Sequence, residues 1–150
     1  MDFTFVPLTI DDAREIKNWD YDGEFDALFM TPYFTSFEKD RVLIGPGGCE
    51  GFVALVNNLV SGLFEFTLCD EEMVIGLALA PGLVGKGFGA DFVNQGIQFG
   101  LEHYGTKVDV IKLEVDHTNI AAIRVYEKAG FKRIKQTGVE IEMRRKVQHQ

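Results

Sequence analysis

The stretch PGLVGKGFGADF, residues 81–92, places glycines at positions 85, 87 and 89, directly after an apolar run and directly before a segment with helical spacing. Glycine at every second position lets the backbone adopt positive φ angles and leaves no side chain between the main chain and an approaching ligand. If a helix begins near Phe88, the unpaired N–H groups of its first turn point into this loop, where the helix dipole favours negative charge. The loop therefore suits a phosphate group, although a tight strand-to-helix turn without a ligand would use the same residues.

Before this loop the sequence predicts a strand and a helix. FTFVPL, residues 3–8, is typical of a short strand, and Thr9 with Asp12 forms a variant capping box that begins the first helix. Residues 23–41 are interrupted by Pro32 and suggest a broken helical segment.

A predicted hairpin precedes the glycine loop. GFVALV at residues 51–56 and LVSGLFEFTL at residues 59–68 flank Asn57 and Asn58, a two-residue connection that suits a type I′ turn. EMVIGLALA, residues 72–80, continues as a third strand and ends at the glycine loop.

After the loop, apolar residues recur at helical spacing, namely at Val93, Ile97, Leu101 and Tyr104. Gly96 and Gly100 would let this helix pack closely on a sheet. The remaining segments predict a strand at residues 108–115, a helix from Thr118 or Asn119 to Gly130, and two strands at residues 131–136 and 139–147. This order predicts an α/β layered fold with a mixed sheet, in a single domain over residues 1–150.

Composition limits the classes of function. A net charge of −8 argues against nucleic acid or an anionic membrane surface as the partner. No run of 18 apolar residues exists and the first residues lack the pattern of a signal peptide, so we expect a cytoplasmic protein. Cys49 and Cys69 lack a CxxC spacing and a histidine cluster. We therefore expect reduced, mostly buried thiols and no metal site.

Charge is unevenly distributed along the chain. Residues 1–75 carry 15 Asp and Glu against 4 Lys and Arg, whereas residues 76–150 carry 8 against 11. An ordinary solvated surface can show such a bias by chance. The functional interpretation is that the second half binds an anion and the first half attracts a cation.

Two known phosphate loops fit the glycine stretch poorly. Gly85, Gly87 and Ala90 satisfy the dinucleotide pattern GxGxxA, but a dinucleotide-binding domain needs further βαβ units after it, and only 60 residues follow Ala90. A Walker A loop is excluded because Lys86 is followed by glycine where Ser or Thr should bind magnesium.

The segments LALAPGLVGKGFGADFV and NIAAIRVYEKAGF resemble motifs A and B of the GNAT superfamily of acetyl-CoA-dependent N-acetyltransferases. The resemblance is close over residues 72–135 and looser over the rest of the chain. It implies a mixed, mostly antiparallel central sheet with helices on both faces. It also implies transfer of an acetyl group from acetyl-CoA to a primary amine by direct attack.

The resemblance assigns the cofactor site. It implies that backbone N–H groups of the loop bind the pyrophosphate of coenzyme A, namely those of Gly85, Lys86, Gly87, Phe88, Gly89 and Ala90. The preceding strand would offer backbone groups of Leu77, Ala78 and Leu79 to the pantetheine arm, with the Leu79 N–H polarising the thioester carbonyl. Val84 occupies a position where the family usually has Arg or Gln, which predicts weaker or differently ordered cofactor binding.

Asn119 and Tyr126 lie seven residues apart, so they share one face of the predicted helix. On the sequence alone, Asn119 could be only an N-cap and Tyr126 only a core aromatic. The resemblance implies that Asn119 hydrogen-bonds the pantetheine or phosphate region and that Tyr126 lies near the sulfur. A phenol with a pKa near 10 stays protonated at neutral pH and can act as general acid on the leaving thiolate.

No residue declares itself as general base. Glu65 is the carboxylate most suited to face the sheet, and a chain of waters is the alternative. The acidic and aromatic first half, including Asp20 and Asp22, suggests a cationic acceptor: a polyamine-like or aminoglycoside-like molecule, a protein N-terminus or a lysine.

Two other functions remain open at this point. The domain could be a non-catalytic acyl-CoA-binding sensor, or a dinucleotide-binding protein. The closing strand at residues 139–147 could offer an edge for pairing in a homodimer.

Overall fold

The computed structural model describes residues 1–21, 28–105 and 107–148. Its helices and strands are β1 (Thr4–Pro7), α1 (Ile10–Lys17), α2 (Thr31–Asp40), β2 (Glu50–Val56), β3 (Leu59–Cys69), β4 (Glu72–Leu79), α3 (Gly89–Tyr104), β5 (Val110–Asp116), α4 (Ile120–Lys128), β6 (Lys132–Thr137) and β7 (Glu140–Lys146). Short 3₁₀ turns lie at Pro46–Gly48 and Pro81–Leu83.

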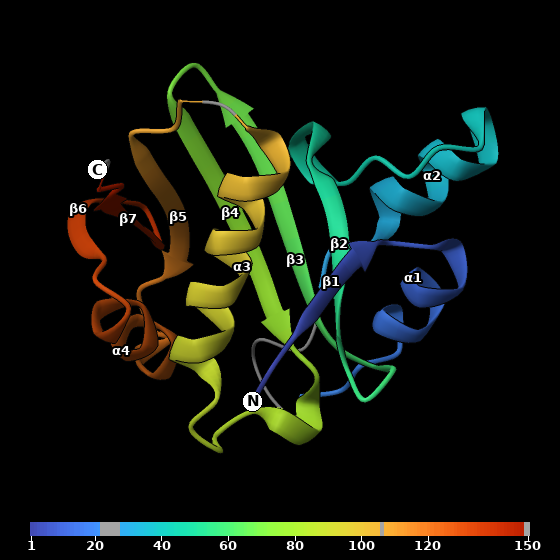
Figure 1. Ribbon diagram of the computed structural model, residues 1–150, viewed down its shortest axis with the longest axis horizontal. Helices are drawn as coiled ribbons and strands as arrows, with labels where there is room; N and C mark the ends of the chain where they lie inside the picture. The colour runs from blue at the N-terminus through green and yellow to red at the C-terminus, as the bar shows by residue number, and fades with distance from the viewer. Residues whose placement is uncertain (22–27, 106, 149–150) are drawn as a thin grey trace.

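The strands form one seven-stranded sheet in the order β1-β2-β3-β4-β5-β7-β6 (Figure 1). Every neighbouring pair is antiparallel except β4 and β5, which are parallel. This confirms the mixed, mostly antiparallel sheet.

The parallel pair is short. β4 is in register with β5 only from Glu72 opposite Val110 to Val74 opposite Lys112, whereas β3 pairs with β4 along its whole length. Beyond Val74 the β4 strand therefore diverges from β5 and opens the sheet. At the paired end an ion pair joins β4 to β7, because Arg144 Nη1 lies 2.9 Å from Glu72 Oε1.

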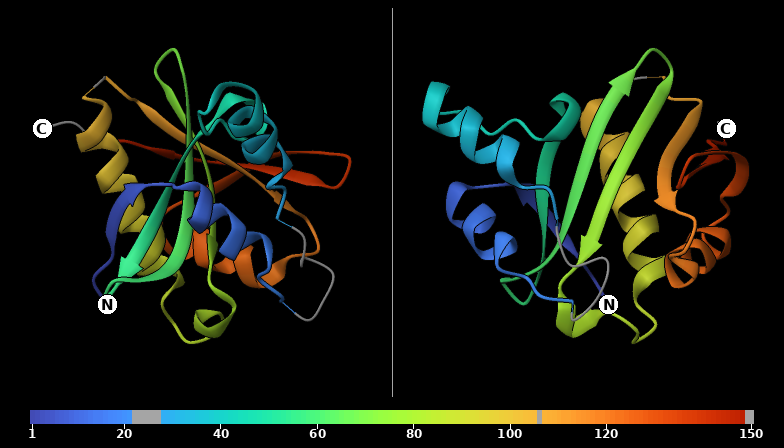
Figure 2. Two further views of the ribbon diagram at one scale, coloured as in Figure 1. Left: turned by 90° about the vertical axis from the view of Figure 1, so that its right-hand side faces the viewer. Right: turned by 180° about the vertical axis from the view of Figure 1, so that it is seen from behind.

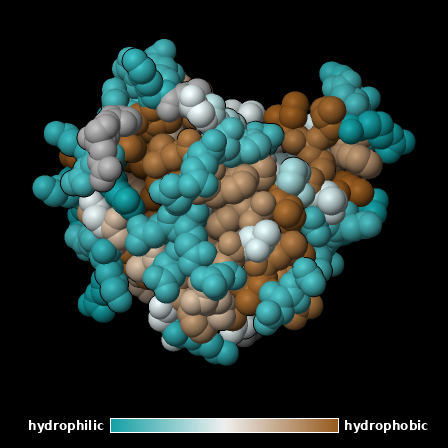
Figure 3. All heavy atoms as spheres, viewed as in Figure 1, coloured by the Kyte–Doolittle hydropathy of each residue, from teal (hydrophilic) through white to brown (hydrophobic). Residues whose placement is uncertain are grey.

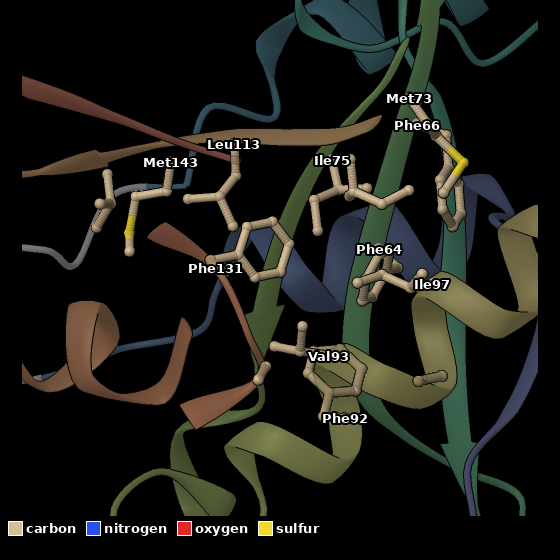
Figure 4. Close-up of a cluster of buried hydrophobic side chains, with 14 of the residues drawn as sticks. Phe64, Phe66, Met73, Ile75, Phe92, Val93, Ile97, Leu113, Phe131 and Met143 are labelled. Carbon is tan, nitrogen blue, oxygen red and sulfur yellow. The ribbon is translucent and has the colours of Figure 1, made fainter. Parts of the chain in front are cut away.

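Helices cover both faces of the sheet (Figures 1 and 2). Phe64 and Phe66 of β3 pack with α3 in the larger hydrophobic core, while Leu63 on the opposite side of the same strand packs with α1 and α2. Figure 4 shows the larger core, where side chains from β3, β4, β5, β7 and α3 meet. A Cβ at Gly96 would overlap the Phe64 ring, so the predicted close packing of this helix is confirmed.

Local sequence signals act as expected. Thr9 and Asp12 form the capping box of α1. Asn57 and Asn58 have φ angles of 51° and 64°, as a type I′ turn requires. Asn119 caps α4 by accepting a hydrogen bond from the Ala122 N–H.

Three expectations need correction or completion. β7 lies between β5 and β6, so the prediction that residues 139–147 form a free edge is wrong, and β6 is the edge strand. Cys49 is buried as predicted, but Cys69 is exposed because it ends β3 at a tight turn. The predicted broken helical segment appears as α2, with Pro32 in its first turn, and its first part lies outside the described residues.

On the face seen in Figure 1, hydrophobic residues gather over β1 and the region of α2, with hydrophilic residues around them (Figure 3). No helix within the described ranges has both the length and the apolar character that crossing a membrane requires.

Candidate active site

The glycine loop leaves its backbone exposed to a ligand. Gly85 and Gly87 have φ angles of 76° and 85°, and a Cβ added at either position would meet no atom within 4 Å. Among the described residues, none accepts a hydrogen bond from the backbone N–H groups of residues 85–91; the first N–H of this region that donates is that of Phe92, to the Phe88 carbonyl at 3.0 Å. The loop and the first turn of α3 thus present a run of free donors.

The open end of β4 presents a second set of backbone groups, which β3 does not pair. The Ala80 N–H donates to the Ser61 carbonyl at 2.9 Å, and hydrogen-bonded pairs alternate along an antiparallel ladder. Leu79 and Leu77 are therefore non-hydrogen-bonded partners of β3, and their N–H and C=O groups point toward β5. Since β5 pairs only as far as Val74, these groups face the opening between the two strands.

Tyr21 occupies one of these backbone positions. Its hydroxyl donates to the Leu79 carbonyl at 2.5 Å, and burial raises the pKa of Tyr21 to about 12. The contact joins the segment after α1 to the open end of β4, although the two residues are 58 positions apart. No sequence signal pointed to it.

The loop and the opening meet in a cavity of about 730 Å³, within the usual size of a ligand site. Its walls include most of the predicted cofactor-binding residues: Leu77, Ala78, Leu79, Val84, Gly85, Gly87, Gly89, Asn119 and Tyr126. The predicted residues Lys86, Phe88 and Ala90 do not line it. The structure thus brings together segments from β4, the glycine loop and α4.

Val84, the departure from the family pattern, lies on the wall of this cavity with 52 % of its surface exposed. An apolar side chain there adds no hydrogen bond to a phosphate. Backbone N–H groups remain the principal donors of the loop.

Asn119 is an N-cap whose side chain also lies at the cavity wall. Its Oδ1 accepts from the Ala122 N–H at 3.2 Å, which makes it the N-cap of α4, and it also lines the cavity. The side-chain amide nitrogen has no partner among the described residues and is available to a ligand.

Tyr126 lies on the same side of α4 as Asn119, at the wall of the cavity. Its ring contacts Phe131 edge to face, with centroids 6.1 Å apart, and burial raises its pKa to about 12. Within the described ranges, its hydroxyl has no hydrogen-bond partner. The phenol is thus protonated at neutral pH and free to donate.

Glu65 lies at a different place. It lines a smaller cavity of about 80 Å³, and its carboxylate accepts a hydrogen bond from the Tyr33 hydroxyl at 2.5 Å. Burial raises the pKa of Glu65, while hydrogen bonds from Tyr33 and Cys49 act against this rise. Tyr33 comes from α2 and lies 32 residues away in sequence, so the sequence gave no indication of the contact.

The two cavities adjoin, because Leu28, Leu77 and Ala78 line both. Asp20, one of the acidic residues expected near a cationic acceptor, lines the larger cavity; Asp22 lies outside the described residues. The described part of the chain contains no group of three or more His, Cys, Asp and Glu side chains placed to bind a metal.

Comparison with known proteins agrees with this arrangement. No curated protein sequence matches the chain. Among solved structures, spermidine N-acetyltransferase from Vibrio cholerae in complex with CoA and spermine has a TM-score of 0.72 at 18 % identity, over 96 % of this chain and 95 % of that one. AAC(6′)-Ib in complex with ribostamycin and coenzyme A has a TM-score of 0.72 at 19 % identity, over 97 % of this chain and 94 % of that one.

A third solved structure, the ribosomal-protein-S18-alanine N-acetyltransferase from Escherichia coli, has a TM-score of 0.70 at 19 % identity, over 99 % of this chain and 96 % of that one. These likenesses show a shared fold. The sequence profile of the acetyltransferase (GNAT) family matches residues 10–131. With the glycine loop, the opened β4 strand and the match over most of its length, the chain belongs to the acetyltransferase (GNAT) family.

Proposed function

We propose that this protein is an acetyl-CoA-dependent N-acetyltransferase that acts on a primary amine of a cationic acceptor by direct attack. The observation that carries the proposal is the convergence of two sets of backbone groups on one cavity of about 730 Å³: those of Gly85, Gly87 and Gly89 in the glycine loop, and those of Leu77 and Leu79 that β3 does not pair. One set suits a pyrophosphate and the other suits an extended amide-containing arm, which are the two parts of coenzyme A.

Cofactor binding would use main-chain donors first. The N–H groups of Gly85, Gly87 and Gly89, which line the cavity, would bind the pyrophosphate, and the dipole of α3 would favour its charge. The pantetheine arm would lie along Leu77, Ala78 and Leu79 and pair with backbone groups of Leu77 and Leu79 that β3 leaves unpaired, in the way that an added strand pairs with a sheet edge. The Asn119 amide would donate to the same arm or to a phosphate, because its Oδ1 is already occupied by the α4 cap.

Two groups would assist the chemical step at the thioester. The Leu79 N–H would donate to the carbonyl oxygen as negative charge develops there. As the amine nitrogen bonds to the acetyl carbon and the C–S bond breaks, the Tyr126 hydroxyl would donate its proton to the leaving sulfur. Tyr126 would then recover a proton from the new amide nitrogen through water.

Glu65 would accept the proton that the acceptor ammonium must lose. A cationic acceptor arrives as an ammonium ion and must lose one proton before its nitrogen can attack. A carboxylate whose pKa is raised by burial is a better base than an exposed one, and Glu65 lies in a cavity that adjoins the cofactor cavity. The complete reaction converts an ammonium ion and a thioester into an amide, a thiol and one proton, which leaves from Glu65 to solvent.

The acceptor class follows from charge. The first half of the chain carries an excess of acidic residues, and Asp20 and Glu65 lie at the two cavities. Spermine and ribostamycin, which are named in the structures of similar fold, are both polyamines in the chemical sense. A substrate with more than one amino group fits this charge distribution.

Isothermal titration with acetyl-CoA, coenzyme A and NAD tests the cofactor assignment, followed by a thiol-release assay against a panel of amines. Gly87→Val should weaken acetyl-CoA binding at least tenfold, because a branched residue is strained at a φ of 85°. Gly138→Val is the matched control, since Gly138 also has a positive φ and open surroundings but lies in the β6–β7 turn.

Failure of acetyl-CoA to bind, or equal binding by the Gly87→Val protein, would overturn the cofactor assignment. Binding of NAD instead would support a dinucleotide-binding protein. Binding of acetyl-CoA without thiol release for any amine would indicate a non-catalytic acyl-CoA-binding module.

A further inference from the structure

We propose that the small cavity beside Glu65 is a slot for the aminomethyl end of an unbranched alkyl chain, and that Tyr33 is the positioning residue that orients Glu65 toward it. This inference rests on the proposed function, and it selects among the acceptor classes that charge alone leaves open. It favours terminal CH₂–NH₃⁺ groups over α-amino groups, which carry a branch at the carbon next to nitrogen.

The slot has one charged wall in otherwise apolar surroundings. Glu65 is its single ionisable lining residue among the described residues, and the other walls are Leu28, Phe29, Met30, Pro46, Leu63, Leu77 and Ala78. Such a lining suits a methylene chain that ends in a cation.

Size limits what can enter. An engineered cavity of about 150 Å³ in another protein accommodates benzene, so a cavity of about 80 Å³ holds roughly half as many heavy atoms. An aminomethyl or aminoethyl end fits this volume. The α-amine of a peptide, with a side chain and a carbonyl on its first carbon, does not fit unless the walls move.

The Glu65 side chain lies over β4, where a glycine leaves room for it. A Cβ at Gly76, opposite Glu65 on β4, would lie 3.0 Å from Glu65 Oε1, so the absence of a side chain there makes room for the carboxylate. Ala78, two residues further along the same face, lines both cavities. Oε1 therefore lies over Gly76, two residues before Ala78 on the same face of β4.

Tyr33 fixes the other carboxylate oxygen. Its side chain is fully buried, and its hydroxyl donates to Glu65 Oε2 at 2.5 Å. A Cβ at Gly45 or at Gly51 would lie 2.5 Å from the Tyr33 hydroxyl oxygen, so two further glycines leave space for the phenol. Tyr33 thus holds Oε2, Cys49 also hydrogen-bonds this carboxylate, and we assign Oε1, which faces Gly76, to the ammonium group of the acceptor.

The titratable groups facing Glu65 are few. Tyr33 approaches from α2. The Cys49 thiol, just before β2, hydrogen-bonds the Glu65 carboxylate and lies 3.6 Å from the Tyr33 hydroxyl. Burial raises the pKa of Cys49 to about 12 and raises that of Tyr33 further above its ordinary value. Both groups are thus neutral at pH 7, and Glu65 is the group of the cluster with the lowest ordinary pKa.

The slot is tested with amines matched in charge and length, such as 1,4-diaminobutane, its analogue with a methyl group beside each nitrogen, and a dipeptide amide with a free α-amine. We expect kcat/KM to be at least tenfold higher for the unbranched diamine than for the other two. Phe29→Ala should reduce this preference, because Phe29 lines the slot and is 65 % exposed, so its truncation widens the mouth without unfolding the core. Equal kcat/KM values for branched and unbranched amines would overturn the slot.

Positioning by Tyr33 is tested with Tyr33→Phe and the matched control Tyr104→Phe. Both variants remove a hydroxyl that donates to a glutamate, but Tyr104 pairs with Glu50, which lines neither cavity. Loss of the Tyr33 hydrogen bond removes a contact that lowers the pKa of Glu65, so the acid limb of the kcat/KM profile should move to higher pH. We also expect kcat to fall about tenfold with little change in the KM for acetyl-CoA.

An unchanged pH profile in Tyr33→Phe would reduce Tyr33 to a structural role and overturn this part. Failure of the proposed function looks different, because acetyl-CoA would then fail to bind or no amine would release thiol from the unaltered protein. Acetyl transfer without a preference for unbranched amines would overturn the slot proposal and leave the proposed function standing.

Discussion

Asn119 offers the sharpest test of the site, because the structure gives it one contact that stabilises a helix and one free group that faces a cavity. Its Oδ1 accepts from the Ala122 N–H at 3.2 Å, and its amide nitrogen is available to a ligand. Asn119→Ala removes both functions. Asn119→Asp keeps a good N-cap acceptor but replaces the NH₂ donor with a negative charge beside the expected phosphates.

The two substitutions should therefore differ in their effects on stability and on acetyl-CoA affinity. Loss of an N-cap costs about 1 kcal/mol, which corresponds to about 2–4 °C in Tm for a chain of this size. Asn119→Ala should show this loss, whereas Asn119→Asp should unfold within about 0.5 kcal/mol of the unaltered protein. In contrast, the Kd for acetyl-CoA should rise about tenfold in Asn119→Asp, which is about 1.4 kcal/mol.

Thermal unfolding with and without acetyl-CoA measures both effects in one assay. At a ligand concentration of about 100 times the Kd of the unaltered protein, acetyl-CoA stabilises that protein by about 2.7 kcal/mol and the Asp variant by about 1.4 kcal/mol. Thr9→Ala is the control, because it removes the cap of α1, which lines neither cavity, and should lower Tm without changing the Kd. Equal stabilisation of the Asp variant and the unaltered protein would refute a ligand contact at Asn119.

Three further outcomes are expected. Tyr126→Phe should lower kcat about 100-fold or more and leave the Kd for acetyl-CoA within a factor of two in titration, because the ring keeps its packing and only the proton donor is lost; an unchanged kcat would exclude it as general acid. Gly96→Ala should destabilise the fold by about 1–3 kcal/mol in urea unfolding, since the added Cβ would overlap Phe64, and unaltered stability would show that the ring can move. The hydrogen bond from Arg144 lowers the pKa of Glu142, so its stabilising contribution is present above the ordinary glutamate range and is lost as pH falls through the lowered pKa; urea midpoints from pH 7 to pH 3 should fall less steeply in Glu142→Gln, and parallel curves would contradict the assignment.

Much of the fold follows from local signals in the sequence. Alternating apolar residues, the Thr9 capping box and the Asn57-Asn58 turn each depend on neighbours within a few positions, and all three appear in the structure. The position of β7 did not follow, because insertion between β5 and β6 is a matter of pairing between distant segments.

In the candidate site, too, features that depend on neighbouring residues could be predicted and contacts between distant segments could not. The glycine loop and Asn119 were visible because their roles depend on local backbone geometry. The contacts of Tyr21 with Leu79 and of Tyr33 with Glu65 were not, because each joins residues more than 30 positions apart and neither lies in a recognisable motif. Nothing in the spacing of Glu65 indicated that its partner is a phenol on α2.

The short register between β4 and β5 has a consequence for the cooperativity of unfolding. Because the β1–β4 part of the sheet meets the part formed by β5, β7 and β6 only near Glu71 to Val74, the two parts share few backbone hydrogen bonds. They are held together mainly by α3, α4 and the ion pair between Arg144 and Glu72. Native-state amide exchange should then resolve two units that open at different free energies. A ligand that spans the opening would couple them, so their exchange rates should converge when acetyl-CoA is bound.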